Sequence, residues 1–171
     1  MKGTNGMNSI VTRTSIRNYQ DRNVESEKIT KILKAAMQAP SAGNQQPWEF
    51  YVVENSGVIE ELSKSSPYAG CAKGAPVVLI TCCKTKDIVF PSLNVIDVSI
   101  ATTHILLEAE ELGLGAVWLA VAPIEERIEK VRKAADIRED LIPLALVPIG
   151  YPAEEKKQPD RFDKNRIHFV R

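Results

Sequence analysis

The sequence predicts an α+β protein with three layers (α/β/α), in which a central mixed sheet is flanked by helices. Three observations support this fold class. The chain has 171 residues, of which 44% are hydrophobic, and this suits one compact domain with a sizeable core. Strand-like and helix-like patterns follow one another along the chain. We see no internal repeat, low-complexity tract or domain boundary, so residues 1–171 are expected to form a single domain.

The first periodic segment predicts a helix, and the next one a strand. Apolar residues recur at helical spacing over residues 29–37, with Glu25 or Ser26 as the candidate N-cap and Pro40 just beyond the end. The segment 48–54, WEFYVVE, is rich in aromatic and β-branched residues, which favours a strand.

A short helix and a buried strand are expected next. Residues 57–65 place their apolar side chains on one side, as in a short helix. The run 76–83, PVVLITCC, is apolar throughout, which favours a central strand covered on both faces. We interpret Cys82 and Cys83 at its end as small buried hydrophobes rather than redox centres. Cys71 is expected to be more exposed, and no neighbouring residue marks it as a nucleophile.

The longest predicted helix spans residues 92–112. Its apolar residues cover more than one face, which is typical of a helix that is buried on several sides. In a domain of this size, a partner subunit is the natural cover. We interpret Asp97 near the start of this helix as a cap or helix-dipole partner, and His104 in its middle as a core or interface histidine.

Two more strands and another helix complete the predicted sheet. Residues 115–121 predict one strand, and a helix is expected to start at Pro123, because proline suits the first helical position. Residues 141–150 predict a further strand. Pro143 and Pro148 within it favour an irregular or edge position, since proline cannot donate to a neighbouring strand.

The two ends of the chain have different patterns. Residues 151–164 are charged and contain proline, and residues 167–170, IHFV, predict a short strand. A terminal strand on an extended linker can pair with a neighbouring subunit. Residues 1–7 are polar and contain glycine, so they are expected to form a poorly ordered tip.

Composition limits the classes of partner. The 22 basic and 22 acidic residues give a net charge of zero, so no global charge favours nucleic acid or an anionic membrane. No apolar run approaches membrane-spanning length and no signal-peptide core is present, so we expect a soluble cytoplasmic protein. Three unevenly placed cysteines and two histidines argue against a disulfide framework, a metal site or Ser-His catalysis.

Two polar motifs carry the functional signal. RTSIRNY at residues 13–19 places two arginines and two hydroxyls within five residues, and APSAGNQQPWEF at residues 39–50 follows about one helix later. Arginine is a forked donor for phosphate, while Ser, Asn and Gln both donate and accept, as a flavin's pyrimidine edge and ribityl chain require. Two arginines four residues apart are also typical of a solvated helix face, and the second motif also fits a simple turn between prolines.

Together and in this order, the motifs resemble those of the FMN-dependent nitroreductase family, whose members carry RxSxR and then PSxxNxQPW. The matching residues are Arg13, Ser15, Arg17, Pro40, Ser41, Asn44, Gln46, Pro47 and Trp48. Weaker similarity runs through GLGAVWLA at 113–120 and IGYP at 149–152. The resemblance implies a mostly antiparallel sheet and an intertwined homodimer in which the C-terminal extensions are exchanged.

The resemblance also implies a set of cofactor contacts and no catalytic residue, because the flavin carries the chemistry. The implied contacts are Arg13, Thr14, Ser15, Arg17, Pro40, Ser41, Ala42, Asn44, Gln46, Val117, Trp118, Leu119 and Arg161. Arg13 and Ser15 would hold the phosphate end, with Thr14 contributing backbone. Arg17 would reach the ribityl or pyrimidine part, and Arg161 would supply another phosphate-binding base.

The remaining implied contacts come from two other segments. The family places the loop with Asn44 and Gln46 against FMN held by the other subunit. It places residues 117–119 beside the isoalloxazine ring, with backbone amides near N5 and O4, where negative charge develops on reduction. The GLGAV sequence does not indicate a Rossmann site, because Trp118 stands where a third glycine is required. Trp48, at a strand start, is interpreted as a core residue.

The function that the resemblance implies is an FMN-dependent NAD(P)H oxidoreductase. A homodimer would bind two FMN at the subunit interface, take a hydride from NADH or NADPH, and reduce nitroaromatic, quinone or related conjugated acceptors by a ping-pong mechanism. One alternative is a specialised reductase on the same scaffold, such as a dehalogenase-like enzyme. Others are a flavin-binding redox sensor without turnover and an interaction module without a cofactor.

Overall fold

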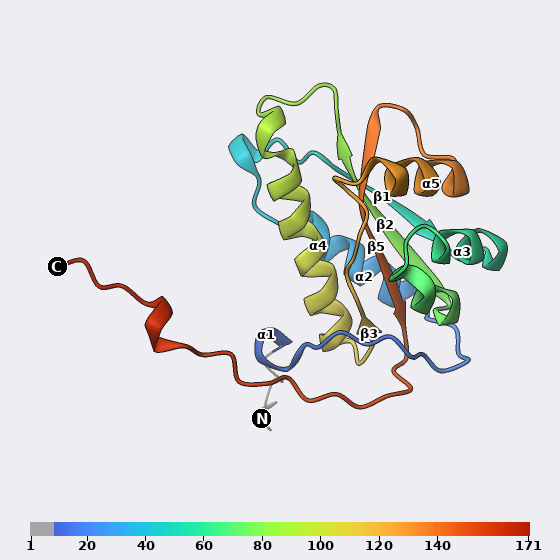
Figure 1. Ribbon diagram of the computed structural model, residues 1–171, viewed down its shortest axis with the longest axis horizontal. Coiled ribbons are helices and arrows are strands. Elements are labelled where there is room, and N and C mark those ends of the chain that lie inside the picture. Colours follow the sequence, from blue (N-terminus) through green and yellow to red (C-terminus); the bar gives the residue numbers. More distant parts are fainter. Residues whose placement is uncertain (1–8) are drawn as a thin grey trace.

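The computed structural model describes residues 9–171, so the expected N-terminal tip lies outside the described residues. A five-stranded sheet forms its centre, with the order β1-β2-β5-β3 and with β4 also paired to β5 (Figure 1). The strands are β1 (Trp48–Val53), β2 (Val77–Lys84), β3 (Gly115–Ala116), β4 (Leu119–Ala120) and β5 (Leu141–Gly150). All these pairs are antiparallel, and Ser15 adds one parallel bridge to Ala116.

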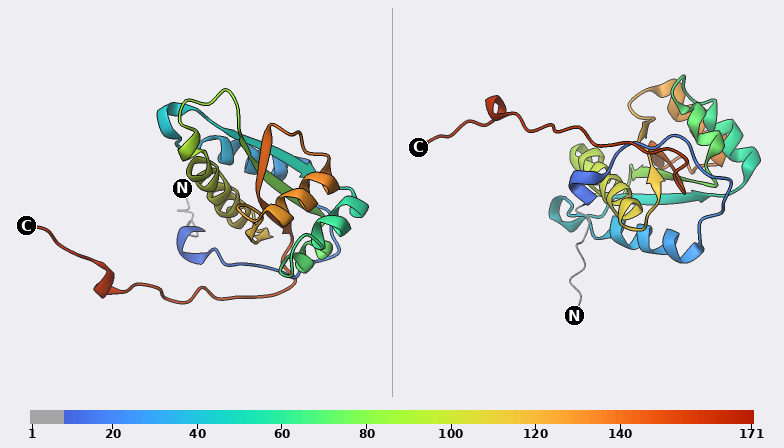
Figure 2. Two further views of the ribbon diagram at one scale, coloured as in Figure 1. Left: turned by 45° about the horizontal axis from the view of Figure 1, so that its top comes forward. Right: turned by 90° about the horizontal axis from the view of Figure 1, so that it is seen from below.

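Helices cover both faces of the sheet (Figure 2). The α-helices are α1 (Ser9–Thr12), α2 (Ser26–Met37), α3 (Ser56–Ser63), α4 (Asn94–Glu111) and α5 (Glu125–Ala135). The 3-10 turns are η1 (Ala42–Asn44), η2 (Ala69–Gly74), η3 (Pro91–Leu93) and η4 (Lys164–Arg166). Helices α3 and α5 share one apolar cluster with the sheet, and α2 and α4 pack on its opposite face. The predicted α+β class with its mostly antiparallel sheet is confirmed.

Strand β2 lies in the interior, as its continuous apolar run predicts. It pairs with β1 on one side and β5 on the other, and its residues from Val77 to Cys83 are all buried. Successive side chains point to opposite faces, so Cys82 joins the cluster under α3 and α5, while Cys83 joins the cluster under α4. Burial raises the pKa of both thiols to about 12, which keeps them protonated and confirms their interpretation as buried small hydrophobes.

Strand β5 occupies a central position, so the expected edge position is wrong. The expected irregularity is present, because the register against β2 shifts between Thr81 and Cys82 and leaves Leu144 unpaired across it. On its other side, β5 pairs with β3 and β4 in one common register that is interrupted opposite Pro148. Proline has no N–H to give to a neighbouring strand, so it fits at this interruption.

The interruption divides the strand predicted over residues 115–121 into β3 and β4, with Val117 and Trp118 between them. The following helix begins at Glu125 rather than at Pro123, and Ile124 is its N-cap. The predicted terminal strand at residues 167–170 is not formed in this chain, where these residues are irregular and exposed. The C-terminal tail instead extends away from the body of the fold (Figures 1 and 2).

Helix α4 packs its buried side on the sheet through Val98, Ala101 and Ile105, which are fully buried. Its other side is not covered by the described chain, since Val95 and Ile96 are 47% and 56% exposed. The burial expected on several sides is therefore incomplete in one copy of the protein. In residues 9–171, no helix combines the length and apolar character that crossing a bilayer requires.

Candidate functional site

The RTSIR segment, residues 13–17, is extended and lies beside β3. Helix α1 ends at Thr12, and the backbone N–H of Ile16 then donates to the carbonyl of Ala116 at 3.1 Å. Ser15 forms the parallel bridge to the same residue. Arg13 and Arg17 therefore do not share a helix face, and the alternative of a solvated helix face is wrong.

A glycine allows this close approach. A Cβ atom at Gly115 would lie 2.6 Å from Cγ2 of Ile16, far inside van der Waals contact. Ile16 is only 5% exposed and is fixed by its surroundings. The absence of a side chain at position 115 thus sets how closely the RTSIR segment packs on β3.

Three pockets lie along this segment, and one of them, of about 340 Å³, is lined by Thr14 together with Glu154 and Lys156. Arg13 and Arg161, far apart in the sequence, both line a pocket of about 530 Å³. Arg17 lines a second pocket of about 540 Å³ together with Trp118 and Leu119. The structure therefore brings Arg13 and Arg161 together at one end of the segment, and Arg17, Trp118 and Leu119 together at the other. Of the other predicted contacts here, Thr14, Ser15 and Val117 line neither of these two pockets.

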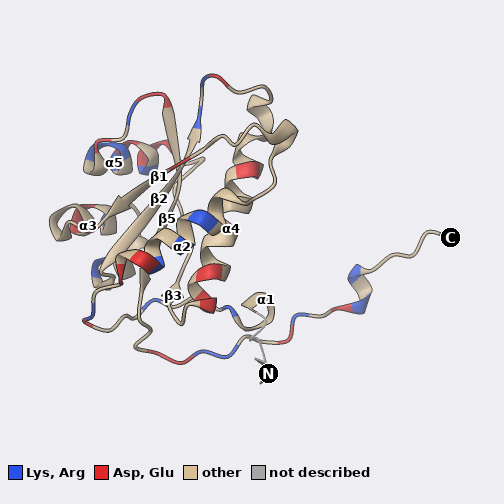
Figure 3. Cartoon of the chain, turned by 180° about the vertical axis from the view of Figure 1, so that it is seen from behind, with Lys and Arg blue, Asp and Glu red and all other residues tan. Residues whose placement is uncertain are grey.

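The C-terminal tail runs beside the RTSIR segment and completes this region. The amide N–H of Ala153 donates to the carbonyl of Asn18, and Lys156 Nζ lies 3.5 Å from the carbonyl oxygen of Ser15. Figure 3 shows Lys and Arg along both the segment and the tail, with Asp and Glu interspersed along the tail. Among residues 9–171, no ion pair engages the guanidinium of Arg13, Arg17 or Arg161.

Glu154 anchors the segment and was missed from the sequence. Its carboxylate accepts hydrogen bonds from the backbone N–H of Arg17 at 2.6 Å and from the Asn18 side chain at 3.0 Å. It also forms an ion pair with Lys156 at 2.9 Å. The hydrogen bond from the Arg17 backbone, followed by that from Lys156, lowers the pKa of Glu154 to about 2. Glu154 therefore stays charged and holds the segment through its backbone, not through its arginine side chains.

The second motif forms a tight loop around η1. Asn44 and Gln46 have φ angles of 55° and 47°, in the left-handed region. The Ser41 hydroxyl accepts the N–H of Gln46 at 3.0 Å, and the Asn44 side-chain oxygen accepts from the Gln46 amide at 3.2 Å. Ser41 and Ala42 are half-buried, while Pro40, Asn44 and Gln46 are exposed. The loop thus presents two amide side chains outward from a constrained backbone.

Asp97 and Gln45 hold this loop in place. Asp97 is 3% exposed, and its carboxylate accepts the N–H of Ala42 at 3.0 Å and the side-chain amide of Gln45 at 2.7 Å. The oxygen of that amide accepts the N–H of Phe90 at 2.8 Å. Asp97 lies in the first turn of α4, as a dipole partner would, but its hydrogen bonds go to a loop 55 residues away in sequence.

The two motifs lie at opposite ends of α4. The loop contacts Asp97 in the first turn of the helix, whereas the N–H of Ser9, in α1, reaches the carboxylate of Glu111 in the last turn. These turns are about 20 Å apart along the helix axis. A single copy of the chain therefore does not bring the two motifs into one pocket.

Comparison with known proteins identifies the fold family. The nitroreductase family model matches residues 10–66 and 66–151. The chain belongs to the nitroreductase family. The predicted enzyme class, an NAD(P)H oxidoreductase of this family, is thereby confirmed.

Several nitroreductase-family proteins are similar over nearly their whole length. A Methanothermobacter thermautotrophicus protein, provisionally named NADH dehydrogenase/NAD(P)H nitroreductase, is 48% identical over 95% of this chain and 85% of its own. An FMN-dependent nitroreductase of known structure from Clostridium difficile is 31% identical with a TM-score of 0.89, covering 96% of this chain and 98% of its own. A provisionally named nitroreductase from Desulfovibrio desulfuricans, solved in complex with FMN, is 26% identical with a TM-score of 0.85 and covers 99% of both chains.

Two further side chains interpreted from the sequence, Trp48 and His104, lie in the interior or partly buried. Trp48 is 8% exposed and packs with Cys83 and Val98, so it is the predicted core residue. His104 is half-buried, with Nδ1 3.0 Å from the carbonyl oxygen of Ala35. Within residues 9–171, no three His, Cys, Asp or Glu side chains gather as a metal ion requires.

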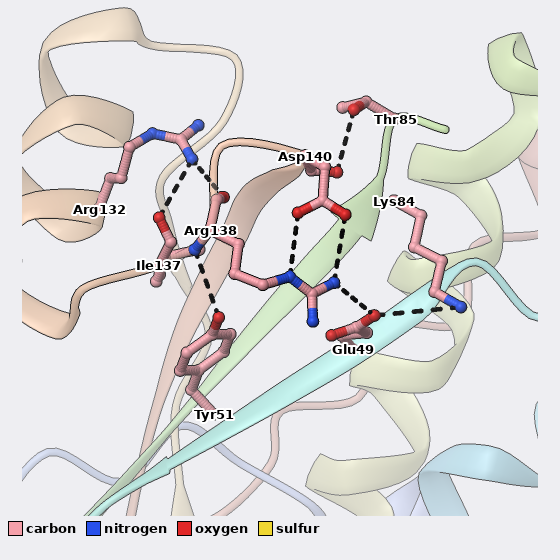
Figure 4. Close-up of polar contacts among 8 residues, drawn as sticks. All are labelled: Glu49, Tyr51, Lys84, Thr85, Arg132, Ile137, Arg138 and Asp140. Carbon is pink, nitrogen blue, oxygen red and sulfur yellow. Dashed lines mark hydrogen bonds and ion pairs between the residues drawn. The ribbon is translucent and has the colours of Figure 1, made fainter. Parts of the chain in front are cut away.

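Arg138, unlike Arg13, Arg17 and Arg161, is paired with carboxylates. Arg138 donates to both oxygens of Asp140 at 3.0 and 3.2 Å and to Glu49 at 3.0 Å (Figure 4). Its backbone is held as well, because Arg132 donates to the carbonyl of Arg138 at 2.6 Å. These bonds tie the turn before β5 to β1. The hydrogen bonds that Arg138 donates to Asp140 and then to Glu49 raise the pKa of Arg138, and the bond to Asp140 in turn lowers the pKa of Asp140.

Proposed function

We propose that two copies of this chain hold FMN at their interface and transfer electrons from NADH or NADPH to nitroaromatic, quinone or related conjugated acceptors by a ping-pong mechanism. The observation that carries the proposal is the placement of Arg13 and Arg161 around one pocket, where neither guanidinium forms an ion pair within the described chain. Asp160 also lines this pocket, and its carboxylate accepts the N–H of Phe162. A phosphate monoester suits the forked donors of the two guanidinium groups.

The residues present fit FMN by their chemistry. Arg13 and Arg161 would bind the phosphate, with the Ser15 hydroxyl and the Thr14 backbone beside it. At the other end of the segment, Arg17 would meet the pyrimidine edge, and residues 117–119 would pack against the ring. Along the extended segment 13–17, the phosphate ligands would thus lie at one end and the ring pocket at the other, as the phosphate and the ring lie at opposite ends of FMN.

When bound, FMN would supply the hydride and electron transfer. The chain would orient and polarise it. The positive charge of Arg17 would stabilise negative charge at the pyrimidine edge, since a fixed guanidinium near a developing anion lowers its energy. Leu119 lines this part of the pocket and is 6% exposed, and the neighbouring Val117 is 1% exposed, so the ring would lie against buried apolar residues.

The loop of residues 41–46 would contact FMN bound to the partner copy. This arrangement is supported by the separation of the two motifs along α4 and by the apolar surface that one copy leaves uncovered. Val95, Ile96 and Phe90 are exposed on or before α4, and Phe162 and Phe169 are 68% and 78% exposed on the extended tail. A second copy that covers α4 and receives the tail would bury these side chains and bring Asn44 and Gln46 to the cofactor.

The first test is an absorbance spectrum after FMN addition and desalting, followed by anaerobic addition of NADH and then NADPH. Retained flavin absorbance that bleaches with either donor is the expected result. Retained flavin that neither donor bleaches would favour a sensor or another reductant. A protein that retains no flavin would contradict the proposal and favour an interaction module.

The shared site is tested by hybrid dimers. Arg13→Gln damages the phosphate half, and the double change Asn44→Ala with Gln46→Ala damages the loop half. In a dimer formed from one copy of each variant, one site carries both defects and the other carries neither. Mixing the two variants by unfolding and refolding them together is expected to restore tight FMN sites. If each site is built from a single chain, the mixture will bind no better than the average of the two variants.

A further inference from the structure

The pocket that contains the predicted ring contacts also has a wall that no flavin contact accounts for. Its lining residues are Arg17, Ser66, Tyr68, Cys71, Trp118, Leu119, Ala120 and Arg127. Only Arg17, Trp118 and Leu119 are predicted flavin contacts. The remaining wall comes from the stretch that leads into η2, from Cys71 within η2, from Ala120 of β4 and from the first turn of α5. It includes one guanidinium and one aromatic ring.

Arg127 is fixed at this wall but not neutralised. Its Nη1 donates to the carbonyl of Ala120 at 3.0 Å, directly after the predicted ring contacts. The adjacent acid, Glu126, pairs with Lys130 at 2.7 Å instead. Among the described residues, Arg127 makes no ion pair, so its positive charge and remaining N–H donors are available to a ligand.

The aromatic group beside Arg127 is Tyr68. The Arg127 guanidinium carbon lies 5.9 Å from the centroid of the Tyr68 ring, and Tyr68 is 75% exposed. Trp118 lines the same pocket and is half-buried. A planar molecule that enters here therefore meets aromatic surfaces and a cation.

The charged side chains that line this pocket are all positive. Its lining residues in the described chain include Arg17 and Arg127 but neither Asp nor Glu. Burial is the main cause that raises the pKa of the Cys71 thiol, so this residue adds no negative charge at neutral pH. Such a pocket favours an anionic ligand over a neutral one of the same shape.

We infer that Arg127, with Tyr68 beside it, determines specificity for the second substrate and selects aromatic acceptors that carry an anionic group such as a carboxylate. This inference rests on the proposed function, because it assigns the wall of the pocket that the proposed flavin contacts leave unused. Arg127 contacts the anionic group of the acceptor, and the aromatic side chains contact its ring. The bound flavin delivers the electrons, so Arg127 affects which acceptor binds and takes no part in electron transfer.

The test compares 4-nitrobenzoate with 4-nitrobenzamide, which match in shape and differ in charge. In the FMN-loaded enzyme, Arg127→Gln is expected to lower the ratio of kcat/KM for 4-nitrobenzoate over 4-nitrobenzamide about tenfold, and Arg127→Lys is expected to retain most of it. Lys133→Gln removes the same charge from the same helix outside this pocket and is expected to leave the ratio unchanged. The KM for the nicotinamide donor, measured separately, shows whether Arg127 binds a donor phosphate instead, and that outcome would contradict the inference.

A binding measurement separates failure of this inference from failure of the proposed function. Calorimetric titration of 4-nitrobenzoate without a nicotinamide donor involves no turnover, and it can be performed on protein with or without FMN. Weaker binding to Arg127→Gln than to the wild type and Lys133→Gln supports the inference in either preparation. Equal affinity in wild type and Arg127→Gln, or no binding to the wild type, would overturn it. Loss of FMN retention alone would contradict only the proposed function.

Discussion

Two arginine-rich regions of this nitroreductase-family protein differ in how their charges are satisfied. Arg138 is bound on both sides by carboxylates, from Asp140 in its own turn and Glu49 on β1 (Figure 4). Arg13 and Arg161 line one pocket together with Asp160, and neither guanidinium forms an ion pair in residues 9–171. Both regions bring together residues that are distant in sequence, yet only one of them is complete without a ligand.

The difference shows how structural and ligand-binding cations can be told apart. A guanidinium whose donors are used within the chain gains from holding two elements together and has little left for a ligand. Guanidinium groups that share a pocket repel each other unless an anion lies between them. In the RTSIR region Glu154 is used by backbone N–H groups and by Lys156, and it forms no ion pair with Arg13, Arg17 or Arg161 in the described chain.

The largest expected effect follows removal of an unpaired arginine. Arg13→Gln is expected to weaken FMN binding roughly 100-fold, because a charge-assisted hydrogen bond to phosphate is lost from a half-buried position. The same change is expected to leave the Tm of the cofactor-free protein nearly unchanged, since no internal partner is lost. Fluorescence titration with FMN and thermal unfolding measure the two quantities. A large loss of Tm with unchanged FMN affinity would place Arg13 in the structural class with Arg138.

The sequence was sufficient for most of the fold because its signals are local. The apolar run of β2 and the helical spacing of α2 each predict an element that the structure contains. The errors have non-local causes. The strand over 115–121 is broken opposite Pro148, about thirty residues further along the chain, and β5 is central because of partners that its own prolines do not reveal.

The candidate site was predictable to a similar extent. Arg13, Ser15 and the 41–46 loop were recognised from their residue types and order. Glu154 and Asp97 were not recognised in their roles, because they act on the backbone of segments 137 and 55 residues away. A lone acid in a sequence carries no sign of which distant N–H groups it will bind. The distance between the two motifs along α4 likewise requires the fold.

The next largest effect is expected for a change that displaces the RTSIR segment but keeps its arginines. It tests whether ligand binding depends on the position of the segment as well as on its charge. Gly115→Ala would place a methyl group 2.6 Å from Cγ2 and 2.7 Å from Cβ of buried Ile16, so the segment must shift. We expect a loss of roughly 2 kcal/mol in the free energy of unfolding, together with weaker FMN binding although Arg13 and Arg17 both remain. Urea unfolding and FMN titration measure these effects. Gly70→Ala is a control, because a Cβ there meets no atom within 4 Å. Unchanged values for Gly115→Ala would show that the segment tolerates displacement.

A smaller effect is expected in the paired region. Arg138→Gln removes the bidentate contact with Asp140 and the contact with Glu49, in which the Arg138 side chain is 55% exposed and the two acids are partly exposed. Exposed ion pairs contribute little, so Tm is expected to fall by only about one to a few degrees, with FMN affinity unchanged. Added salt should reduce the difference from wild type, because it screens the pairs. If FMN affinity falls as far as in Arg13→Gln, the division into structural and ligand-binding arginines is wrong.

The smallest effect concerns the acid that serves the RTSIR backbone. Glu154 has a pKa of about 2 in the folded protein, below its ordinary value of 4.5, mainly because it accepts from the Arg17 backbone and then from Lys156. A carboxyl whose pKa is lowered by folding stabilises the fold above its unfolded pKa, and this contribution is lost as the pH falls toward the folded pKa. Wild type is therefore expected to lose more stability between about pH 5 and pH 3 than Glu154→Gln does, as measured by urea unfolding at both pH values. Glu155→Gln, one residue further along the tail, should retain the wild-type loss. If Glu154→Gln and wild type lose the same amount, Glu154 does not anchor the segment, and the unpaired state of its arginines needs another cause.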